Sequence, residues 1–351
     1  MSTATESVAK QPGGGPPERS ASRFAGAFPI RLAKRGLIAR EGSIVLVTVV
    51  LIVYFAFKYA PFLTYGNWTT AIPYFAPYGI IAIGEVFLMI NAEIDLSVGG
   101  TFLLSEFVYY YCCQGGMPDW LGVIIALAAC AAAGLVNGIF TAFIGINSFI
   151  TTLGMLFALN GIVLVVSNDQ QLTLQHSQGG SFASVFGAGT YSELIWLVVL
   201  GIILQLVLTR TRWGLHTIAV GSNRIGAAEA GVRVRAILIR NFIVCATLAG
   251  LTGLLEGFRD SGSITPDPSS SQTFLLQAIA AAVIGGTLLA GGEGTVIGAM
   301  IGALFLGVIT DGLTIGGVSD NYLYLWTGVA ILLAMVINTY VGRVRRRSGV
   351  G

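Results

Sequence analysis

The chain has 351 residues, of which 54% are hydrophobic and 10% are charged, and its mean hydropathy is +0.79. A soluble domain carries roughly a quarter of its residues as charged side chains, so this composition excludes a soluble enzyme or binding module. It indicates an all-α polytopic membrane protein whose outer surface contacts membrane lipid. The net charge of +2 gives no reason to expect a nucleic-acid partner.

The first 42 residues predict a tail rather than a spanning helix. They are polar, read Pro-Gly-Gly-Gly-Pro-Pro at 12–17, and become basic toward residue 40. Segments of this composition bury too little apolar surface to fold. Residues 1–42 also lack the pattern of a cleavable signal peptide. We expect a disordered cytoplasmic tail over 1–42, a transmembrane domain over 43–341 and a second basic cytoplasmic tail over 342–351.

Apolar runs between polar breaks predict about ten membrane-spanning helices. A helix needs about 20 mostly apolar residues to cross the hydrocarbon core of a bilayer. The predicted spans are 43–58, 70–90, 98–113, 120–143, 148–167, 192–209, 237–256, 273–290, 295–312 and 321–341.

The distribution of basic residues predicts that both ends of the chain are cytoplasmic. Cytoplasmic segments are enriched in Lys and Arg. Except for Lys58 and Arg259, all of the 19 Lys and Arg residues lie in the N-terminal tail, the interval 210–240 or the C-terminal end. The number of spans before residue 210 is therefore even, and helices two to five and seven to ten form halves of opposite orientation. Inverted halves of this kind enclose a solute path in many transporters.

Two loops on the predicted outer face are polar. The loop 168–191 contains no Lys or Arg, and the loop 260–271 is rich in Ser, Pro and Asp. Such loops either receive an external binding protein or serve only as solvated connections.

The segment 91–100, Asn-Ala-Glu-Ile-Asp-Leu-Ser-Val-Gly-Gly, interrupts an apolar run between the second and third helices. Ionisable residues at this depth are costly and usually face a cavity or a partner. Asp95 and Ser97 also suit the N-cap of the third helix, where a carboxylate matches the helix dipole. A capping role and a solute-path role both remain open. The predicted path residues are Asn91, Glu93, Asp95, Ser97, Asn137, Asn147, Thr151 and Thr152.

The interval 210–236, which the topology places in the cytoplasm, contains a short element suited to docking on another protein. Within Gly-Ser-Asn-Arg-Ile-Gly-Ala-Ala-Glu-Ala-Gly at 221–231, the asparagine suits a helix cap and the last glycine suits a helix stop. Residues 225–230 then form a two-turn helix, narrow enough to enter a groove. The predicted docking residues are Asn223, Ile225, Ala227, Ala228 and Gly231.

A glycine-rich segment runs from 278 to 302. Gly298 and Gly302 form a GxxxG pair, which favours close helix crossing in membranes. The glycines at 291, 292 and 294 predict a sharp turn around Glu293.

Together these segments resemble the ribose-type family of ABC importer permeases, within the broad group that includes branched-chain amino-acid permeases. The matching motifs are Ile94-Asp-Leu-Ser-Val-Gly99, Asn137-Gly138, Phe149-Ile-Thr-Thr-Leu-Gly154, the cytoplasmic Gly221 to Val232 pattern and the glycine-rich run 279–298. They fall in family order between about residues 44 and 340. The family usually has Gly-Gly before Ile-Asp, whereas this chain has Ala92-Glu93.

The resemblance implies a type II ABC importer-like fold in a bacterial cytoplasmic (inner) membrane. It implies that residues 223–231 couple the chain to a separate cytoplasmic ATPase, which holds ATP and Mg. It also implies a periplasmic or extracellular solute-binding protein and a second permease copy, identical or similar. The imported solute would be a sugar or a sugar alcohol, with no cofactor bound to this chain.

Three other functions compete with that of an ABC importer permease: ATP hydrolysis by the chain itself, proton-coupled transport and intramembrane catalysis. The chain has no P-loop, since its only lysines are at 10, 34 and 58, so any ATP hydrolysis must occur in a partner. A proton-coupled secondary transporter of a small polar solute is the alternative. The chain contains no catalytic Ser–His pair and no HExxH motif, which argues against an intramembrane enzyme. Its four cysteines and two histidines suggest no metal site. The carboxylates available for proton coupling are Glu85, Glu93, Asp95, Glu106, Glu256 and Asp311.

Overall fold

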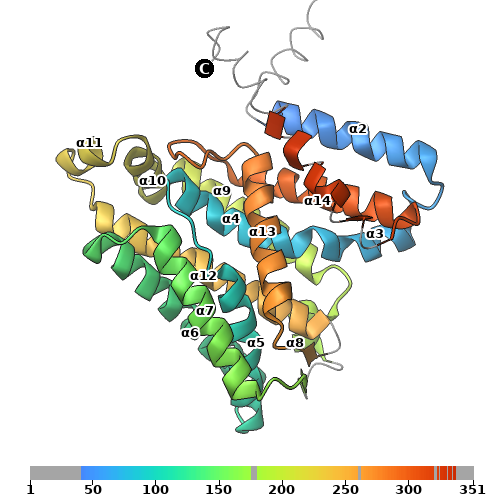
Figure 1. Ribbon diagram of the computed structural model, residues 1–351, viewed down its shortest axis with the longest axis horizontal. Coiled ribbons are helices and arrows are strands. Elements are labelled where there is room, and N and C mark those ends of the chain that lie inside the picture. Colours follow the sequence, from blue (N-terminus) through green and yellow to red (C-terminus); the bar gives the residue numbers. More distant parts are fainter. Residues whose placement is uncertain are drawn as a thin grey trace, which may run out of the picture.

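A computed structural model describes residues 41–174, 180–259, 262–319, 322–323, 325–329, 331–333 and 335–336. Within these residues the protein is helical apart from one small sheet (Figure 1). The predicted tails, except for residues 41–42, and part of the predicted span 321–341 lie outside the described residues. The elements before residue 170 are α2 (Gly42–Lys58), α3 (Tyr65–Ala71), η2 (Ile72–Tyr74), α4 (Ala76–Ile90), α5 (Val98–Gln114), α6 (Asp119–Ile139), η3 (Phe140–Ile144) and α7 (Ser148–Ser167). The later elements are β1 (Leu172–Thr173), α8 (Ser181–Ala183), η4 (Ser184–Ala188), α9 (Ser192–Arg210), α10 (Arg212–Ser222), α11 (Arg224–Glu229), α12 (Val234–Arg259), β2 (Ser263–Ile264), α13 (Pro268–Ile284) and α14 (Val296–Ile315).

Five of the described helical segments are long and apolar enough to cross a membrane. They are α6 with η3, α7, α9, α12 and α14. Counting the bent pair of α3–η2 with α4 as one span raises the number to six. The chain is thus a polytopic helical membrane protein, as predicted. The helices α2, α5 and α13, with 17 residues each, occupy three more of the predicted spans.

The predicted second span, 70–90, is not one straight helix. The chain bends by 41° between the segments Tyr65–Tyr74 and Ala76–Ile90. Pro73 lies in the first turn of η2 and Pro77 in the first turn of α4. A proline has no amide hydrogen to donate to the preceding turn and fixes its own φ angle, so two prolines four residues apart favour separate helix starts over a continuous helix.

Helix α4 is the centre of the core. Every one of its residues except Tyr78 is buried, and it packs against α9, α12, α13 and α14. A helix that is apolar on all sides is stable only when other elements surround it. The residues that follow α4 are therefore held at a defined position inside the protein.

The glycine-rich segment packs α14 closely against the end of α13. A Cβ atom on Gly302 would collide with the carbonyl oxygen of Ala281, and one on Gly298 would collide with that of Gly285. The predicted GxxxG contact is confirmed. The predicted turn is also present, since Gly291 and Gly292 have φ angles of +85° and +81°.

The two polar loops of the predicted outer face meet in a small antiparallel sheet. Leu172 of β1 lies opposite Ile264 of β2, and Thr173 lies opposite Ser263. In Figure 1 this region and α8 lie at the lower right, while α10 and α11 lie at the upper left. The sheet joins the loop between α7 and α9 to the loop between α12 and α13.

Candidate functional site

A buried polar cluster lies where α4 ends and α5 begins. One carboxylate oxygen of Asp95 accepts hydrogen bonds from the backbone amide and the hydroxyl of Ser97, at 2.8 and 2.6 Å. The side-chain amide of Asn137 on α6 donates to that hydroxyl at 2.8 Å and to Asp95 at 3.4 Å. All three side chains are buried. Three predicted path residues are therefore brought together, and in this conformation they bind one another.

Of the two predicted capping residues, Asp95 caps the start of α5 and Ser97 does not. Ser97 precedes α5 but its side chain makes no capping hydrogen bond. Asp95 instead accepts from the Ser97 amide, which would otherwise have no helical partner. The carboxylate therefore stabilises the start of α5, as predicted for a cap, while the Ser97 hydroxyl links α5 to α6.

Glu85 on α4 completes the cluster from the other side of the turn. One of its oxygens lies 3.4 Å from the Asp95 amide nitrogen, and the other accepts from the Cys245 thiol of α12 at 3.5 Å. Among the described residues, Asp95 Oδ2 and Asn137 Oδ1 have no hydrogen-bond partner although both are buried. The cluster thus leaves two acceptor atoms unsatisfied in this conformation.

Asn91 lies in a second, separate network. Its side-chain amide donates to the backbone oxygen of Thr217 on α10 at 2.7 Å. Its side-chain oxygen accepts from Asn241 on α12 at 2.7 Å, and Asn241 in turn accepts from the indole of Trp213 at 2.8 Å. The end of α4 is therefore tied to α10 and α12 by amide hydrogen bonds.

Glu93 does not lie with Asp95 but pairs with a residue of α11. Its carboxylate lies 2.8 Å from the Arg224 guanidinium, which also donates to the backbone oxygen of Asn91 at 3.0 Å. The side chain of Glu93 is 9% exposed and that of Arg224 is 46% exposed. The turn that carries Glu93 contains Ala92 at a φ angle of +58°, a conformation that costs a residue with a Cβ atom about 1 kcal/mol.

The predicted path residues of α7 have different environments. Asn147 is exposed and caps the helix by accepting from the Phe149 amide at 2.9 Å. Thr152 is buried and donates to the backbone oxygen of Ser148 at 2.7 Å. Thr151 is half-buried, and its hydroxyl has no hydrogen-bond partner among the described residues.

One face of α7 is lined by small and polar residues that the other described residues leave uncovered. Their spacing of three or four residues places them on one side of the helix. Added Cβ atoms on Gly154 and Gly161 would meet nothing within 4 Å. The exposed or half-buried members of this α7 small-residue face are Asn147, Thr151, Gly154, Ala158 and Gly161.

The predicted short docking helix is present as α11, with its first residue one position earlier. Asn223 accepts from the Gly226 amide at 2.9 Å and begins α11. The chain leaves the helix through Gly231 at a φ angle of +84°. Ile225 is 74% exposed and Ala228 is exposed. Ala227 points inward, against Val220 and Ile237, so it anchors the helix.

The glycine-rich turn meets the same region. The Gly292 amide donates to the backbone oxygen of Ile90 at 2.8 Å, and Gly221 lies so close to that oxygen that a Cβ atom would collide with it. The ends of α4 and α10 and the turn before α14 therefore converge on one point.

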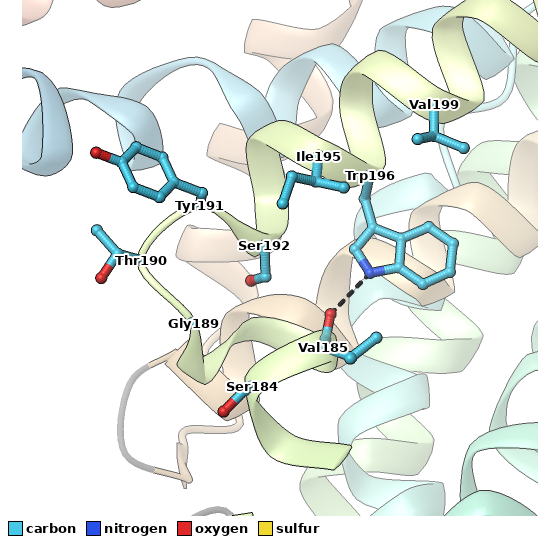
Figure 2. Close-up of a pocket in the computed structure, with 9 residues that line it drawn as sticks. All are labelled: Ser184, Val185, Gly189, Thr190, Tyr191, Ser192, Ile195, Trp196 and Val199. Carbon is cyan, nitrogen blue, oxygen red and sulfur yellow. Dashed lines mark hydrogen bonds between the residues drawn. The ribbon is translucent and has the colours of Figure 1, made fainter. Parts of the chain in front are cut away.

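A pocket of about 500 Å³ lies at the opposite end of the molecule (Figure 2). Its wall is mainly apolar, and the Trp196 indole donates to the backbone oxygen of Val185 at 2.9 Å across it. No predicted path residue lines this pocket. The lining residues are Ser184, Val185, Gly189, Thr190, Tyr191, Ser192, Ile195, Trp196 and Val199.

Sequence reasoning missed three residues that organise this site. In the sequence Arg224 is one of several basic residues in the interval 210–240, and only its long cationic side chain beside a short helix indicates a partner such as Glu93. Asn241 lies inside an apolar helix, where a single amide is itself a signal of an interhelical hydrogen bond. Thr217 contacts Asn91 through its backbone, and no sequence pattern indicates such a contact.

Residues 67–337 match the family described as "Branched-chain amino acid transport system / permease component". The xylose/arabinose import permease protein XylH of Sulfolobus acidocaldarius is 35% identical, over 86% of each chain. The ribose import permease protein RbsC of Escherichia coli K12 is 32% identical, over 79% of this chain and 87% of its own. The L-arabinose ABC transporter permease protein AraH of Azospirillum brasilense is 32% identical, over 88% of this chain and 90% of its own. No solved structure matches the chain.

Proposed function

Because the chain belongs to the family of branched-chain amino acid transport system permease components, we propose that it is the membrane-spanning subunit of an ABC importer for a sugar or sugar alcohol. One observation carries the proposal: sugar import permeases match this chain over at least 79% of its length. Those relatives import pentoses by their names. The chain is a transport subunit and not an enzyme.

The energy source is a separate cytoplasmic ATPase, which binds ATP and Mg. The geometry of α11 supports this partner. Its cap and its glycine stop isolate a short helix with Ile225 and Ala228 exposed, a shape that fits a groove. Inward-facing Ala227 fastens the helix to the permease, so that movement of the helix is passed to the chain.

The chain crosses the cytoplasmic membrane ten times, with both ends inside and two inverted halves. The described helices supply nine of these crossings when α2, α5 and α13 are included. At 1.5 Å per residue, a 17-residue helix reaches about 26 Å, the lower end of what a bilayer core needs. The tenth crossing is the segment 321–341. The basic residues support this arrangement, because it leaves only Lys58 and Arg259 outside.

Two copies of the permease, or two similar permeases, enclose the solute path along the α7 small-residue face. A helix that faces lipid gains most from large apolar side chains, whereas small residues mark a helix partner or a path. The face begins at Asn147 and includes Thr151, two of the predicted path residues. The turn that carries Asp95 and Ser97 contacts the start of α7, where the Ile94 amide donates to the Ser148 hydroxyl at 3.4 Å. Weakly polar groups replace water around a polyol without holding it tightly.

An external solute-binding protein delivers the solute to the outer end of the chain. The sheet of β1 and β2, with α8, presents the polar loops there as one structured surface. This surface carries recognition of the partner, while recognition of the solute belongs to the binding protein.

Reconstitution in liposomes tests the proposed function. The permease is combined with the ATPase and the binding protein encoded beside it, and uptake of radiolabelled xylose, arabinose, ribose and erythritol is measured. We expect uptake of at least one solute to require ATP and to be blocked by vanadate. Uptake that is insensitive to vanadate and is abolished by a protonophore would instead establish the proton-coupled alternative.

A cysteine at position 158 tests the path. Ala158→Cys should form a cross-link between two permease copies or react with a water-soluble thiol reagent from the path. As a matched control, Val165→Cys lies seven residues, or about two turns, further along α7, and Val165 is 77% exposed. A residue at position 158 that reacts only with lipid-soluble reagents would contradict the path assignment.

A further inference from the structure

We infer that the ion pair between Glu93 and Arg224 is the contact through which α11 sets the position of the α4–α5 turn, and hence that both are positioning residues for coupling transport to ATP hydrolysis. This inference rests on the proposed function. It assigns Glu93, which the sequence placed beside the solute, to the energy-coupling region of the molecule.

The first observation is that Arg224 is a bridge rather than a free surface charge. One guanidinium nitrogen donates both to the Glu93 carboxylate at 2.8 Å and to the backbone oxygen of Asn91 at 3.0 Å. Arg224 is the first residue of α11, so a rotation or shift of that helix moves this nitrogen directly. The contact holds both a side chain and the backbone of the turn.

The second observation is that the two sides of the bridge have unequal freedom. Glu93 has a nearly buried side chain, and the turn that carries it contains Ala92 in the left-handed region. Residues held in sparsely populated conformations persist where the surroundings determine them, and they cluster at sites that change shape. Arg224 is half-exposed. Glu93 is therefore held in place by its surroundings, whereas the Arg224 side chain on α11 is free to move.

The third observation is that the turn leads at once to the buried polar cluster. Two residues after Glu93, Asp95 holds the first amide of α5 and contacts Asn137 of α6. A displacement at Glu93 is therefore passed to the start of α5 and to the end of α6. Helix α6 continues through η3 to α7, which carries the proposed path. The ion pair is the polar link between α11 and this chain of contacts within the described residues.

Because the Arg224 side chain is 46% exposed, solvent screens the ion pair and its contribution to folding stability is small. Measuring stability beside transport therefore separates the positioning role from a structural one. The sharpest variants are therefore the charge reversals Glu93→Arg and Arg224→Glu and the double variant that carries both. Solute taken up per ATP hydrolysed is measured in the reconstituted complex, and the amount and thermal stability of the purified permease are measured beside it.

Coupling between sites typically amounts to roughly 5- to 150-fold in an equilibrium. We expect each single reversal to lower the uptake per ATP at least about fivefold, with the amount and stability of the permease nearly unchanged. The double variant should recover at least half of the wild-type ratio. The control combines Glu93→Arg with Arg233→Glu, which has the same net charge. Arg233 is exposed and forms no ion pair with Glu93, so this combination should not recover.

Three results overturn the inference. Single reversals with a wild-type uptake per ATP would show that the contact carries no coupling. A double variant that does not recover, or a control that recovers equally well, would show that the specific pairing is irrelevant. Losses that merely follow the amount of folded permease would show a structural role. If the wild-type complex has no vanadate-sensitive uptake, the proposed function fails instead, and the inference falls with it.

Discussion

Replacing Asn241 with leucine would remove the centre of the amide network that ties α4 to α10 and α12. Asn241 donates to Asn91 at 2.7 Å and to the backbone oxygen of Phe87 at 3.2 Å, and it accepts from Trp213 at 2.8 Å. Leucine has a similar volume but can form none of these bonds. Within the described residues, the Asn91 side-chain oxygen and the Trp213 indole would then have no protein partner.

The expected loss of folding free energy follows from these two polar groups left without a hydrogen-bond partner. Interhelical hydrogen bonds in membrane proteins average only about 0.6 kcal/mol, because the unfolded chain also finds partners. A buried polar group left unsatisfied costs about 1–3 kcal/mol. Asn91 is 1% exposed and cannot turn to water, so the second value applies to it. The free energy of unfolding should fall by about 2–3 kcal/mol.

The measurement is reversible unfolding of the purified permease in mixed micelles with increasing SDS, followed by circular dichroism. Asn160→Leu is the matched control, because Asn160 is also buried but makes one long hydrogen bond, 3.5 Å to Ser271. It should lose less than about 1 kcal/mol. The double variant with Asn91→Leu should lose less than the sum of the two single changes, because it removes both partners. Equal losses at positions 241 and 160, or strict additivity, would refute the reasoning.

Three further outcomes are expected. Gly302→Leu should greatly lower the amount of folded permease, because its side chain collides with the carbonyl oxygen of Ala281. Gly154→Ala, whose added methyl group meets only open space, should leave that amount unchanged. Similar amounts of folded protein for the two variants would contradict the tight contact at Gly302. Ala228→Arg should abolish uptake in a folded and inserted permease, and normal uptake would mean that α11 does not dock on the ATPase. Asp95→Ala should cost about 1 kcal/mol of stability by removing the acceptor for the α5 amide, whereas reduced uptake in Asp95→Asn at a normal protein level would reveal a role beyond capping.

Local rules predicted the elements that depend on neighbouring residues. The Asn223 cap and the stop at Gly231 follow from backbone chemistry within one turn, and both are present. The sharp turn at Gly291 and Gly292 was predicted for the same reason, and the close crossing at Gly302 was predicted from the GxxxG spacing. Hydropathy alone predicts one span over 70–90, whereas Pro73 and Pro77 start two separate helical segments there and the chain bends between them.

Contacts between distant segments could not be predicted from one sequence. Glu93 and Asp95 are two residues apart, yet one pairs with α11 and the other with α6, because a turn sends consecutive side chains in different directions. Hydropathy placed both near a path and could not separate them. The role of the predicted path residues in transport stays a prediction, since burial and hydrogen bonding describe where they lie and not what they contact during uptake.

The central position of α4 has a consequence for how the protein is made. Its partners α12, α13 and α14 follow it by roughly 140 residues or more. At about 5–20 residues per second, the ribosome needs roughly 7–30 s to supply the first of them. During that interval α4 lacks the helices that finally surround it, and its buried Glu85 has no Cys245 to contact. Assembly of this permease therefore depends on interactions, with lipid or with other proteins, that stabilise α4 in the membrane until α12, α13 and α14 have been synthesised.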